Sequence, residues 1–378
     1  MTIKKLALLG YTHDTNLGDQ VIADSAEYLI KRHDSNIKVE RFDLNYSNEF
    51  NTFKKLKRKS INKLLSKISP NLSFKYKVGC YKRDYRNKLD DNSAVMFAGG
   101  GMIKFKYQDC WAHISALIDT AEKSECPVFF NAVGVEGVDE NDFKCQLMKQ
   151  SLNRDVVKMI TTRDDLSLLQ SGYIENKDIE TAQVADSAVF CSEVYGIRRK
   201  KVREVVGVGL VRPSIFKDNG ISLCKDEVVN IYAAILKELE QRGATYQLFT
   251  NGLKGDAIIL SDLEKVMGKR LNLVEPKTPK ELVALISSFQ ATIAARLHAC
   301  IISYSLKVPF VGLVWNNKLK MFGDCIGYSE RMFESHQFEA KLIVERLLSA
   351  ASEGYEPVRY DAYRQTIDSS INKMVSMV

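Results

Sequence analysis

The sequence predicts an α/β protein with two parallel sheets, each covered by helices on both faces. Strand-like and helix-like segments alternate from the start of the chain, where a strand at Lys5–Gly10 precedes an amphipathic helix at Gly18–Arg32. The alternation stops at a basic linker, Arg198–Lys201, and restarts with a strand at Val205–Val211. Because strand–helix–strand units build parallel sheets, we expect two Rossmann-like domains that face each other across a cleft, with ligands at the carboxyl ends of the strands.

The other elements follow from short apolar runs, which indicate strands, and from apolar residues spaced three and four positions apart, which indicate helices. In the first half we expect further strands at Ile37–Leu44, Ser93–Ala98, Pro127–Val135, Val157–Thr161 and Val184–Phe190, and helices at Asp109–Lys123, Asn141–Leu152 and from Asp164 onward. In the second half we expect strands at Tyr246–Thr250, Leu271–Val274, Ala291–Ala295 and Pro309–Val314, and helices at Lys225–Arg242, Asp256–Met267, Pro279–Ser288, Phe338–Ser352 and Tyr360–Val378. These elements divide into an N-terminal domain at 1–197 with a basic helical insertion at 53–90, a C-terminal domain at 202–337, and C-terminal helices at 338–378.

Size and composition exclude several classes of protein. The 378 residues, of which 45% are hydrophobic, suffice for two domains that each have a core. No apolar run approaches the roughly 20 residues that cross a bilayer, and the N-terminus lacks the cleavage site of a signal peptide. The eight cysteines are scattered without a Cys-x-x-Cys pair, which argues against a zinc site and against a disulfide framework. We therefore expect a cytoplasmic protein that binds no metal.

The strongest signal for a site lies in the segment Ala291–Leu313, which reads as strand, turn, helix and strand. In an extended segment alternate side chains share a face, so Arg296 and His298 are expected on one side. They follow a strand and stand beside a helix N-terminus, where free N–H groups favour anions. The residues indicate a phosphate or carboxylate site. The alternative is an arginine that pairs with a neighbouring carboxylate and a histidine that is satisfied in the core.

Two loops of the first half are also candidates. The loop after the first strand carries His13, Asp14, Asn16 and Asp19 directly before a helix, where Asn16 or Asp14 alone would suffice as a cap. The run Gly99–Gly101 follows a buried strand and allows either close approach of the backbone to a ligand or only a tight turn.

These pieces, in this order, resemble the polysaccharide pyruvyl transferase family over nearly the whole chain. The resemblance rests on Asn16-Leu17-Gly18-Asp19, Gly99-Gly100-Gly101, Arg163-Asp164, Ala185-Asp186-Ser187-Ala188, Arg212 and Arg296-Leu297-His298. Two features depart from the family pattern. Ser187 stands where a proline is usual, and the basic stretch at 53–88 has no counterpart in the family.

The resemblance implies a glycosyltransferase-B-like fold and an enzyme that transfers pyruvate from phosphoenolpyruvate to a saccharide as a cyclic ketal. The product would belong to a bacterial surface polysaccharide, a capsule or an exopolysaccharide. Phosphoenolpyruvate serves as co-substrate and no cofactor is expected. The resemblance places Arg296, Leu297, His298 and, less directly, Arg212 at the donor. It leaves His13, Asp14, Asn16, Asp19 and Gly99–Gly101 for the acceptor, whose sugar and linkage to lipid or nucleotide stay open.

The expected chemistry assigns roles to these residues. His298 would act as a general acid or neutralise the departing phosphate, while Arg296 and Arg212 hold the two anionic groups. Asp19, from the opposite domain, is the first choice as the base for the acceptor hydroxyl, with His13 and Asp14 behind it. We interpret Arg163 and Asp164 as an ion pair with a helix start.

Other functions remain open at this point. A nucleotide-sugar glycosyltransferase of the same architecture would also place an arginine and a helix N-terminus at its donor phosphates. A binding protein that kept the fold without catalysis is the third interpretation. Nucleic-acid binding is disfavoured, because the net charge of +7 has a local origin.

That local origin is the segment from Phe53 to Lys88, which carries thirteen basic residues and a single acid, Asp84. Its first part, Phe53–Ile68, predicts a basic amphipathic helix with one apolar stripe, formed by Phe53, Leu56, Ile61, Leu64, Leu65 and Ile68. Such a helix is typical of a peripheral contact with an anionic membrane, here the inner face of the cytoplasmic membrane. The alternatives are a stripe that packs against its own domain and a cationic face that grips a pyrophosphate on the acceptor.

Overall fold

The structure is a computed structural model that describes residues 4–12, 16–44, 52–86, 89, 93–106, 109–199 and 204–378, the side chains of 52–55 and 93 excepted. Contacts divide the chain into two compact units. The first comprises Met1–His13, Ala26–Ala185 and Thr366–Val378, and the second comprises Asp14–Ser25 and Asp186–Gln365. The domain boundaries expected near residues 200 and 338 stay predictions.

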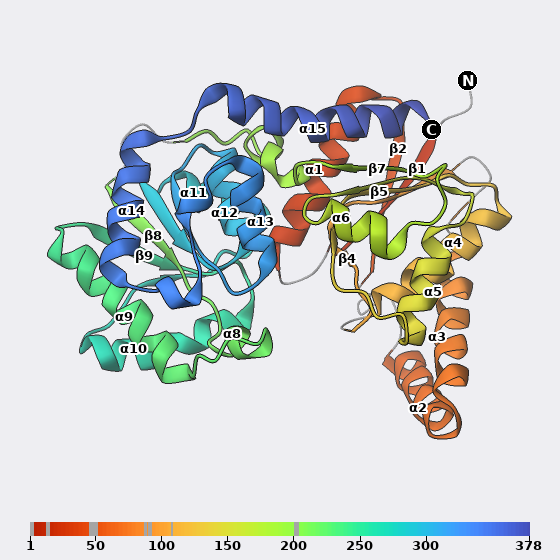
Figure 1. Ribbon diagram of the computed structural model, residues 1–378, viewed down its shortest axis with the longest axis horizontal. Helices are drawn as coiled ribbons and strands as arrows, with labels where there is room; N and C mark the ends of the chain where they lie inside the picture. Colours follow the sequence, from red (N-terminus) through yellow and green to blue (C-terminus); the bar gives the residue numbers. More distant parts are fainter. Residues whose placement is uncertain are drawn as a thin grey trace. The chain divides into compact units, whose positions relative to one another are not determined.

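The first unit is built on a parallel sheet in the order β2-β1-β3-β5-β6-β7, and β4 pairs with β5 beside this path. The strands are β1 Lys5–Gly10, β2 Lys38–Asp43, β3 Ser93–Phe97, β4 Gly100–Ile103, β5 Val128–Val135, β6 Val157–Thr162 and β7 Glu180–Gln183. The helices are the main part of α1 Leu17–His33, then α2 Thr52–Ile68, α3 Pro70–Tyr85, α4 Cys110–Lys123, α5 Phe143–Leu152, the single turn α6 Leu166–Leu168, and the end of α15 Pro357–Ser376. Figure 1 shows α4 and α5 beside this sheet, α3 against them, and α2 as the outermost layer of the unit.

A shared kink explains two of the three consecutive glycines, Gly99 and Gly100. β3 pairs with the first part of β5 and β4 with its last part, so the two short strands follow one line along β5. Between them Gly99 and Gly100 take φ angles of 127° and 86°, which favour glycine. β5 bends at the same level, because Ala132 has a φ of 48° and its N–H donates to Oγ1 of Thr161. The glycines therefore turn the backbone at the carboxyl end of β3.

The second unit repeats the architecture with a parallel sheet in the order β10-β9-β8-β11-β12-β13. Its strands are β8 Val205–Gly209, β9 Thr245–Phe249, β10 Leu273–Val274, β11 Ala291–Ala294, β12 Phe310–Leu313 and β13 Met332–Phe333. Its helices are α7 Cys191–Val194, α8 Ser214–Asp218, α9 Lys225–Gln241, α10 Leu260–Met267, α11 Pro279–Ser287, α12 Leu297–Ser305, α13 Asn317–Ile326 and α14 Ala340–Glu353. The predicted α/β class with two Rossmann-like sheets and C-terminal helices is confirmed.

One predicted strand is wrong. Val184–Phe190 was expected to be a strand, but β7 ends at Gln183 and Ser187–Phe190 form a short 3-10 helix. The N–H of Ala188 donates to Oδ1 of Asp186 at 2.8 Å, which caps this helix. Periodicity alone does not separate a short apolar run in a strand from one in a buried helical turn. The helices α7, α8 and α13 and the strands β4, β7 and β13 were not predicted.

In the described part of the chain, the length and polarity of the helices bear on membrane spans, and the grouping of ligand side chains bears on metal sites. There, no helix is long and apolar enough to cross a membrane. Within the same residues, no three His, Cys, Asp or Glu side chains form a group that could hold a metal ion. All eight cysteines are free thiols.

His113 on α4 makes the stability of the first unit depend on pH. Its ring is buried, stacks on Tyr81 at 3.8 Å between centroids and shares a hydrogen bond of 2.8 Å between Nδ1 and the hydroxyl of Tyr85. Burial lowers the pKa of His113 to about 4. The unfolded chain takes up this proton near pH 6.5, so the stabilisation is complete above that pH and is lost as the pH falls toward 4.

We predict that the free energy of unfolding falls by up to about 3 kcal/mol between pH 6.5 and pH 4 on account of this histidine. Chemical denaturation across this range measures it. His113→Phe should flatten the dependence, whereas His336→Gln at an exposed site should leave it unchanged. An unaltered pH dependence in His113→Phe would contradict the assignment.

Candidate functional site

Polar side chains gather at the carboxyl edge of the second sheet. β9, β8, β11 and β12 are neighbours in that sheet and run parallel, so their carboxyl ends lie at one edge. Arg212 follows β8, Asn251 follows β9, Arg296 follows β11 and Trp315 follows β12. Ligands bind at this edge in open parallel sheets. We therefore expect a ligand site of this unit at this edge.

The centre of this edge is an ion pair between Arg296 and Asp256. Nε of Arg296 donates to Oδ2 of Asp256 at 2.9 Å, and Nη2 donates to Oδ1 at 2.6 Å. The Asp256 side chain has no exposed surface, while that of Arg296 is 17% exposed. The backbone N–H of Arg212 also donates to Oδ1 of Asp256, at 3.0 Å. One buried carboxylate therefore fixes both the guanidinium and the chain after β8.

The ion pair with Asp256 engages only two of the three guanidinium nitrogens of Arg296, Nε and Nη2. Nη1 of Arg296 makes no hydrogen bond with any residue that the structure describes. The sequence left open whether Arg296 pairs with a carboxylate or binds an anion. The structure shows the pairing with Asp256, and an anion at Nη1 is compatible with it.

His298 lies in the first turn of α12 and is buried, with 7% of its surface exposed. The first turn of α1 packs directly on its ring. A Cβ atom at Gly18 would overlap Nδ1, Cβ and Cγ of His298, so only glycine fits there. The imidazole is thus clamped between the starts of two helices, where backbone N–H groups favour negative charge.

Asn251 completes this cluster. Its backbone carbonyl accepts from the N–H of Leu17, next to Gly18, at 3.1 Å. The first turn of α1 therefore touches both Asn251 and His298. Nδ2 of Asn251 is buried and has no hydrogen-bond partner among the described residues. A buried amide donor without a partner costs about 1–3 kcal/mol, so this one calls for an acceptor, which a ligand or an ordered water supplies.

Asp19 is held at the start of α1. Nδ2 of Asn16 donates to Oδ2 of Asp19 at 2.8 Å, and the N–H of Asp19 donates to the carbonyl of Asn16 at 3.1 Å. Both residues were expected in the opposite domain, yet Asp14–Ser25 group with the second unit, which also carries His298. Asp19 therefore lies in the turn that covers the imidazole, one residue after Gly18. His13 and Asp14 lie outside the described residues.

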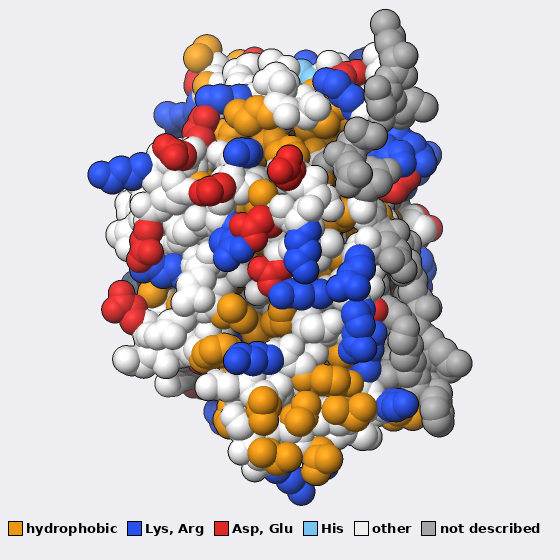
Figure 2. All heavy atoms as spheres, turned by 90° about the vertical axis from the view of Figure 1, so that its right-hand side faces the viewer, with side chains coloured by type: hydrophobic (Ala, Val, Ile, Leu, Met, Phe, Trp, Pro, Cys, Tyr) orange, Lys and Arg blue, Asp and Glu red, His pale blue; other side chains and the backbone are white. Residues whose placement is uncertain are grey.

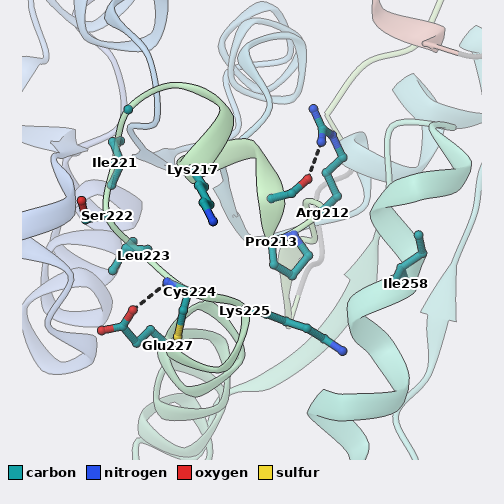
Figure 3. Close-up of a pocket in the computed structure, with 12 residues that line it drawn as sticks. Arg212, Pro213, Lys217, Ile221, Ser222, Leu223, Cys224, Lys225, Glu227 and Ile258 are labelled. Carbon is teal, nitrogen blue, oxygen red and sulfur yellow. Dashed lines mark hydrogen bonds between the residues drawn. The ribbon is translucent and has the colours of Figure 1, made fainter.

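Arg212 lies on the wall of a pocket of about 910 Å³ (Figure 3). Its Nη1 bonds to Oγ of Ser214 and to Oδ2 of Asp218, the latter at 2.6 Å. Lys217 and Lys225 also line the pocket, and Lys225 pairs with Asp262 at 2.5 Å. Because their acids compensate Arg212 and Lys225, the pocket is less cationic than its residue types suggest. Leu297, beside the cluster, is half-buried.

The motif residues of the first unit meet at the carboxyl edge of their own sheet. Oδ1 of Asp164 accepts from the N–H groups of Val135 and Asp165 at 2.9 and 3.0 Å. A Cβ at Gly134 would lie 3.1 Å from Oδ2 of Asp164 and 3.3 Å from Cα of Gly101. Asp164 thus ties the end of β5 to the chain after β6, next to the glycine run.

Comparison with known proteins assigns the class. A profile of the polysaccharide pyruvyl transferase family matches residues 16–317. The chain belongs to this family, so it is a transferase of pyruvyl groups in polysaccharide biosynthesis, with a saccharide as acceptor. No curated protein matches the chain in a direct sequence comparison.

Similar solved structures share the fold at low identity. The UDP-GlcNAc 2-epimerase from Methanocaldococcus jannaschii is 11% identical, with 99% of each chain covered and a TM-score of 0.59. The UDP-GlcNAc 2-epimerase from Neisseria meningitidis, bound to UDP-GlcNAc, is 12% identical over 99% of this chain and 98% of that chain, with a TM-score of 0.57. Medicago truncatula UGT71G1, complexed with UDP-glucose, is 10% identical over 99% and 98%, with a TM-score of 0.53. They show the glycosyltransferase-B-like arrangement of two Rossmann-like domains and nothing of this chain's substrate.

The sequence did not predict three parts of this cluster. They are Asp256, Asn251 and the contact between Gly18 and His298. Asp256 was interpreted only as a helix start. The polar run from Thr250 to Asp256 follows a strand, so the rule of the carboxyl edge could have pointed to it. Which of its side chains faces Arg296 depends on the neighbouring strand and is not visible in the sequence.

We predict that Gly18→Ala lowers the free energy of unfolding by about 1–3 kcal/mol, because the methyl group must displace His298. Urea denaturation measures the loss. Gly79→Ala is the matched control, since Gly79 also lies in a helix and an added Cβ would meet nothing within 4 Å. It should be neutral or stabilise the protein by up to about 1 kcal/mol. Equal effects of the two substitutions would contradict the clamp on His298.

We also predict strong coupling between Arg296 and Asp256. Arg296→Gln leaves a buried charge unpaired and should cost about 3–5 kcal/mol, whereas Arg296→Gln with Asp256→Asn should recover a large part of that loss. A double-mutant cycle by urea denaturation measures the coupling. The partly exposed pair Lys149–Glu175 serves as the control and should couple by less than about 1 kcal/mol. Additive losses at Arg296 and Asp256 would refute the prediction.

Proposed function

We propose that the protein transfers pyruvate from phosphoenolpyruvate to two hydroxyls of a saccharide as a cyclic ketal, in the biosynthesis of a bacterial surface polysaccharide such as a capsule or an exopolysaccharide. The observation that carries the proposal is the cluster of Arg296, His298 and Asn251 at the start of α12. Phosphoenolpyruvate presents a phosphate and a carboxylate. Nη1 of Arg296, Nδ2 of Asn251 and the N–H groups of α12 are donors suited to such groups.

The reaction needs a proton on the methylene carbon of phosphoenolpyruvate, which makes C2 electrophilic. His298 supplies that proton in this proposal, because its ring is fixed in the first turn of α12, two residues after Arg296. One acceptor hydroxyl adds to C2, the phosphate leaves, and the second hydroxyl closes the ring. Of the two hydroxyl protons released, one replaces the proton spent on the methyl group and the other leaves with inorganic phosphate.

The acceptor hydroxyl needs a base, and we assign Asp19 to it. Its carboxylate is held by Asn16, and the residue lies in the turn that covers His298. The backbone of Arg212 is tied to the same carboxylate of Asp256, while its guanidinium pairs with Asp218, so its part in binding the donor stays a proposal on the family resemblance. Asn16 then acts by positioning Asp19. The assignment of Leu297 to the donor, which rests on the family resemblance, and those of His13, Asp14 and Gly99–Gly101 to the acceptor stay proposals.

A binding experiment tests the donor without knowledge of the acceptor. Phosphoenolpyruvate should raise the melting temperature of the protein, and UDP-sugars should not. Arg296→Gln with Asp256→Asn, which keeps the buried site neutral, should fold and lose this response. His336→Gln, at an exposed site, should keep it. Absence of any response of the wild-type protein to millimolar phosphoenolpyruvate would overturn this choice of donor. A response to UDP-sugars alone would favour the alternative, a nucleotide-sugar glycosyltransferase.

Turnover is tested by mass spectrometry of a panel of saccharides incubated with phosphoenolpyruvate. We expect a pyruvyl adduct together with release of one phosphate for each adduct. His298→Gln and Asp19→Asn should each lower turnover by roughly 100-fold or more, and Asp19→Asn should leave the thermal response to phosphoenolpyruvate intact. Unchanged turnover in Asp19→Asn would return this residue to the role of a helix start.

A further inference from the structure

The helices α2 and α3 form a hairpin, Thr52–Tyr85, on the outside of the first unit (Figure 1). α3 is anchored on the helices beneath it. Phe74 packs against Trp111 of α4 at 5.2 Å and Phe143 of α5 at 5.4 Å between ring centroids, and Tyr81 stacks on His113. α2 packs on α3 and forms the outer layer.

Polar contacts fix which face of α2 turns inward. Arg58 donates to both oxygens of Asp84 on α3, at 2.7 and 2.8 Å. Oγ of Ser73 on α3 donates to Oδ1 of Asn62 at 2.7 Å. Ile61 and Leu65 lie toward the same side and are partly buried. Only some residues of the apolar stripe expected on α2 therefore face α3.

The other part is exposed. We call Leu56, Leu64, Ile68 and Leu72 the hairpin patch; their side chains are 59%, 62%, 68% and 47% exposed. They are four of the nine large hydrophobic residues that are exposed in the described part of the chain, and they lie within 17 residues. Single exposed apolar residues are ordinary, but such a cluster marks a surface that contacts something.

Lysines surround the hairpin patch. Some of them form ion pairs with acidic residues and others do not. Lys77 and Lys82 of α3 pair with Asp109 and Asp119. The exposed lysines have no ion pair with any described residue; they are Lys57, Lys59, Lys63, Lys67 and Lys75. Figure 2 shows hydrophobic side chains gathered at the lower end of one face of the molecule, with Lys and Arg side chains at their border.

We propose that this hairpin docks on an anionic lipid bilayer, with α2 in the plane of the headgroups and the hairpin patch toward the acyl chains. The proposal does not depend on the proposed function. An apolar strip bordered by unpaired lysines matches such a surface in both polarity and charge. A second copy of the chain would bring two like-charged faces together. Nucleic acid would call for exposed stacking rings, and Phe74, Tyr81 and Tyr85 pack inward.

The wild-type protein alone gives the first test, by flotation with vesicles. We expect binding to phosphatidylcholine vesicles that contain about one third phosphatidylglycerol, little binding to phosphatidylcholine alone, and loss of binding as salt rises to about 0.5 M. No flotation with the anionic vesicles at low salt overturns the proposal. Equal binding to both kinds of vesicle overturns the assignment to anionic lipid.

Two variants with matched controls locate the contact. Leu64→Ser with Ile68→Ser should weaken vesicle binding at least about tenfold, whereas Leu342→Ser with Val358→Ser, which also removes exposed aliphatic side chains, should not. Lys59→Gln, Lys63→Gln and Lys67→Gln together should weaken it on the order of 100-fold. The same change at the exposed lysines Lys237, Lys280 and Lys341 should have a clearly smaller effect.

Unchanged melting temperatures show that the variants are folded. Binding that survives both hairpin variants places the contact elsewhere and overturns the proposal. Analytical ultracentrifugation of the wild-type protein decides between lipid and a second copy. A dimer that Leu64→Ser with Ile68→Ser dissociates would overturn the proposal, and a monomer that floats with anionic vesicles supports it.

Discussion

The buried carboxylate of Asp256 is the interaction on which the second unit's site depends. It receives two hydrogen bonds from the guanidinium of Arg296 and one from the backbone of Arg212. A buried carboxylate needs such partners, because its desolvation is expensive. Asp256 therefore fixes the chain after β8 and the chain after β11 with a single group, and it sets the direction in which the remaining Nη1 of Arg296 points.

In this arrangement Arg296 can pair with a carboxylate and also bind an anion, which the sequence analysis treated as alternatives. An arginine that pairs with a carboxylate is usually taken as structural, and one that binds an anion as functional. Here the carboxylate takes Nε and Nη2, which orients the guanidinium and restricts its rotation. A ligand that meets Nη1 then has little side-chain entropy left to remove. The imidazole of His298, clamped by Gly18, is restricted in the same way, so the cluster is ordered before a ligand arrives.

The positions of the long elements could be predicted from the sequence. β1 and α9 were placed within one residue at each end, because their apolar patterns run over their whole length and end at turn residues. One failure was local: Val184–Phe190 is a helical turn capped by Asp186, although its apolar run also fits a strand. The other expectation depends on long-range contacts. Asp19 was expected opposite His298, although the helix that it opens begins beside that ring, and no local pattern shows which sheet a helix start touches.

The exposed surface of the hairpin could also be predicted only in part from the sequence. The helical period of α2 was visible in the sequence, and the helix is present at Thr52–Ile68. Which half of its apolar stripe is covered depends on α3, which starts at Pro70 and returns along α2 so that Asp84 reaches Arg58. That ion pair turns Ile61 and Leu65 toward α3 and leaves Leu56, Leu64 and Ile68 in solvent. Because the pair neutralises the arginine on the inner side, the unpaired positive charge of α2 stands on the face that also carries its exposed leucines.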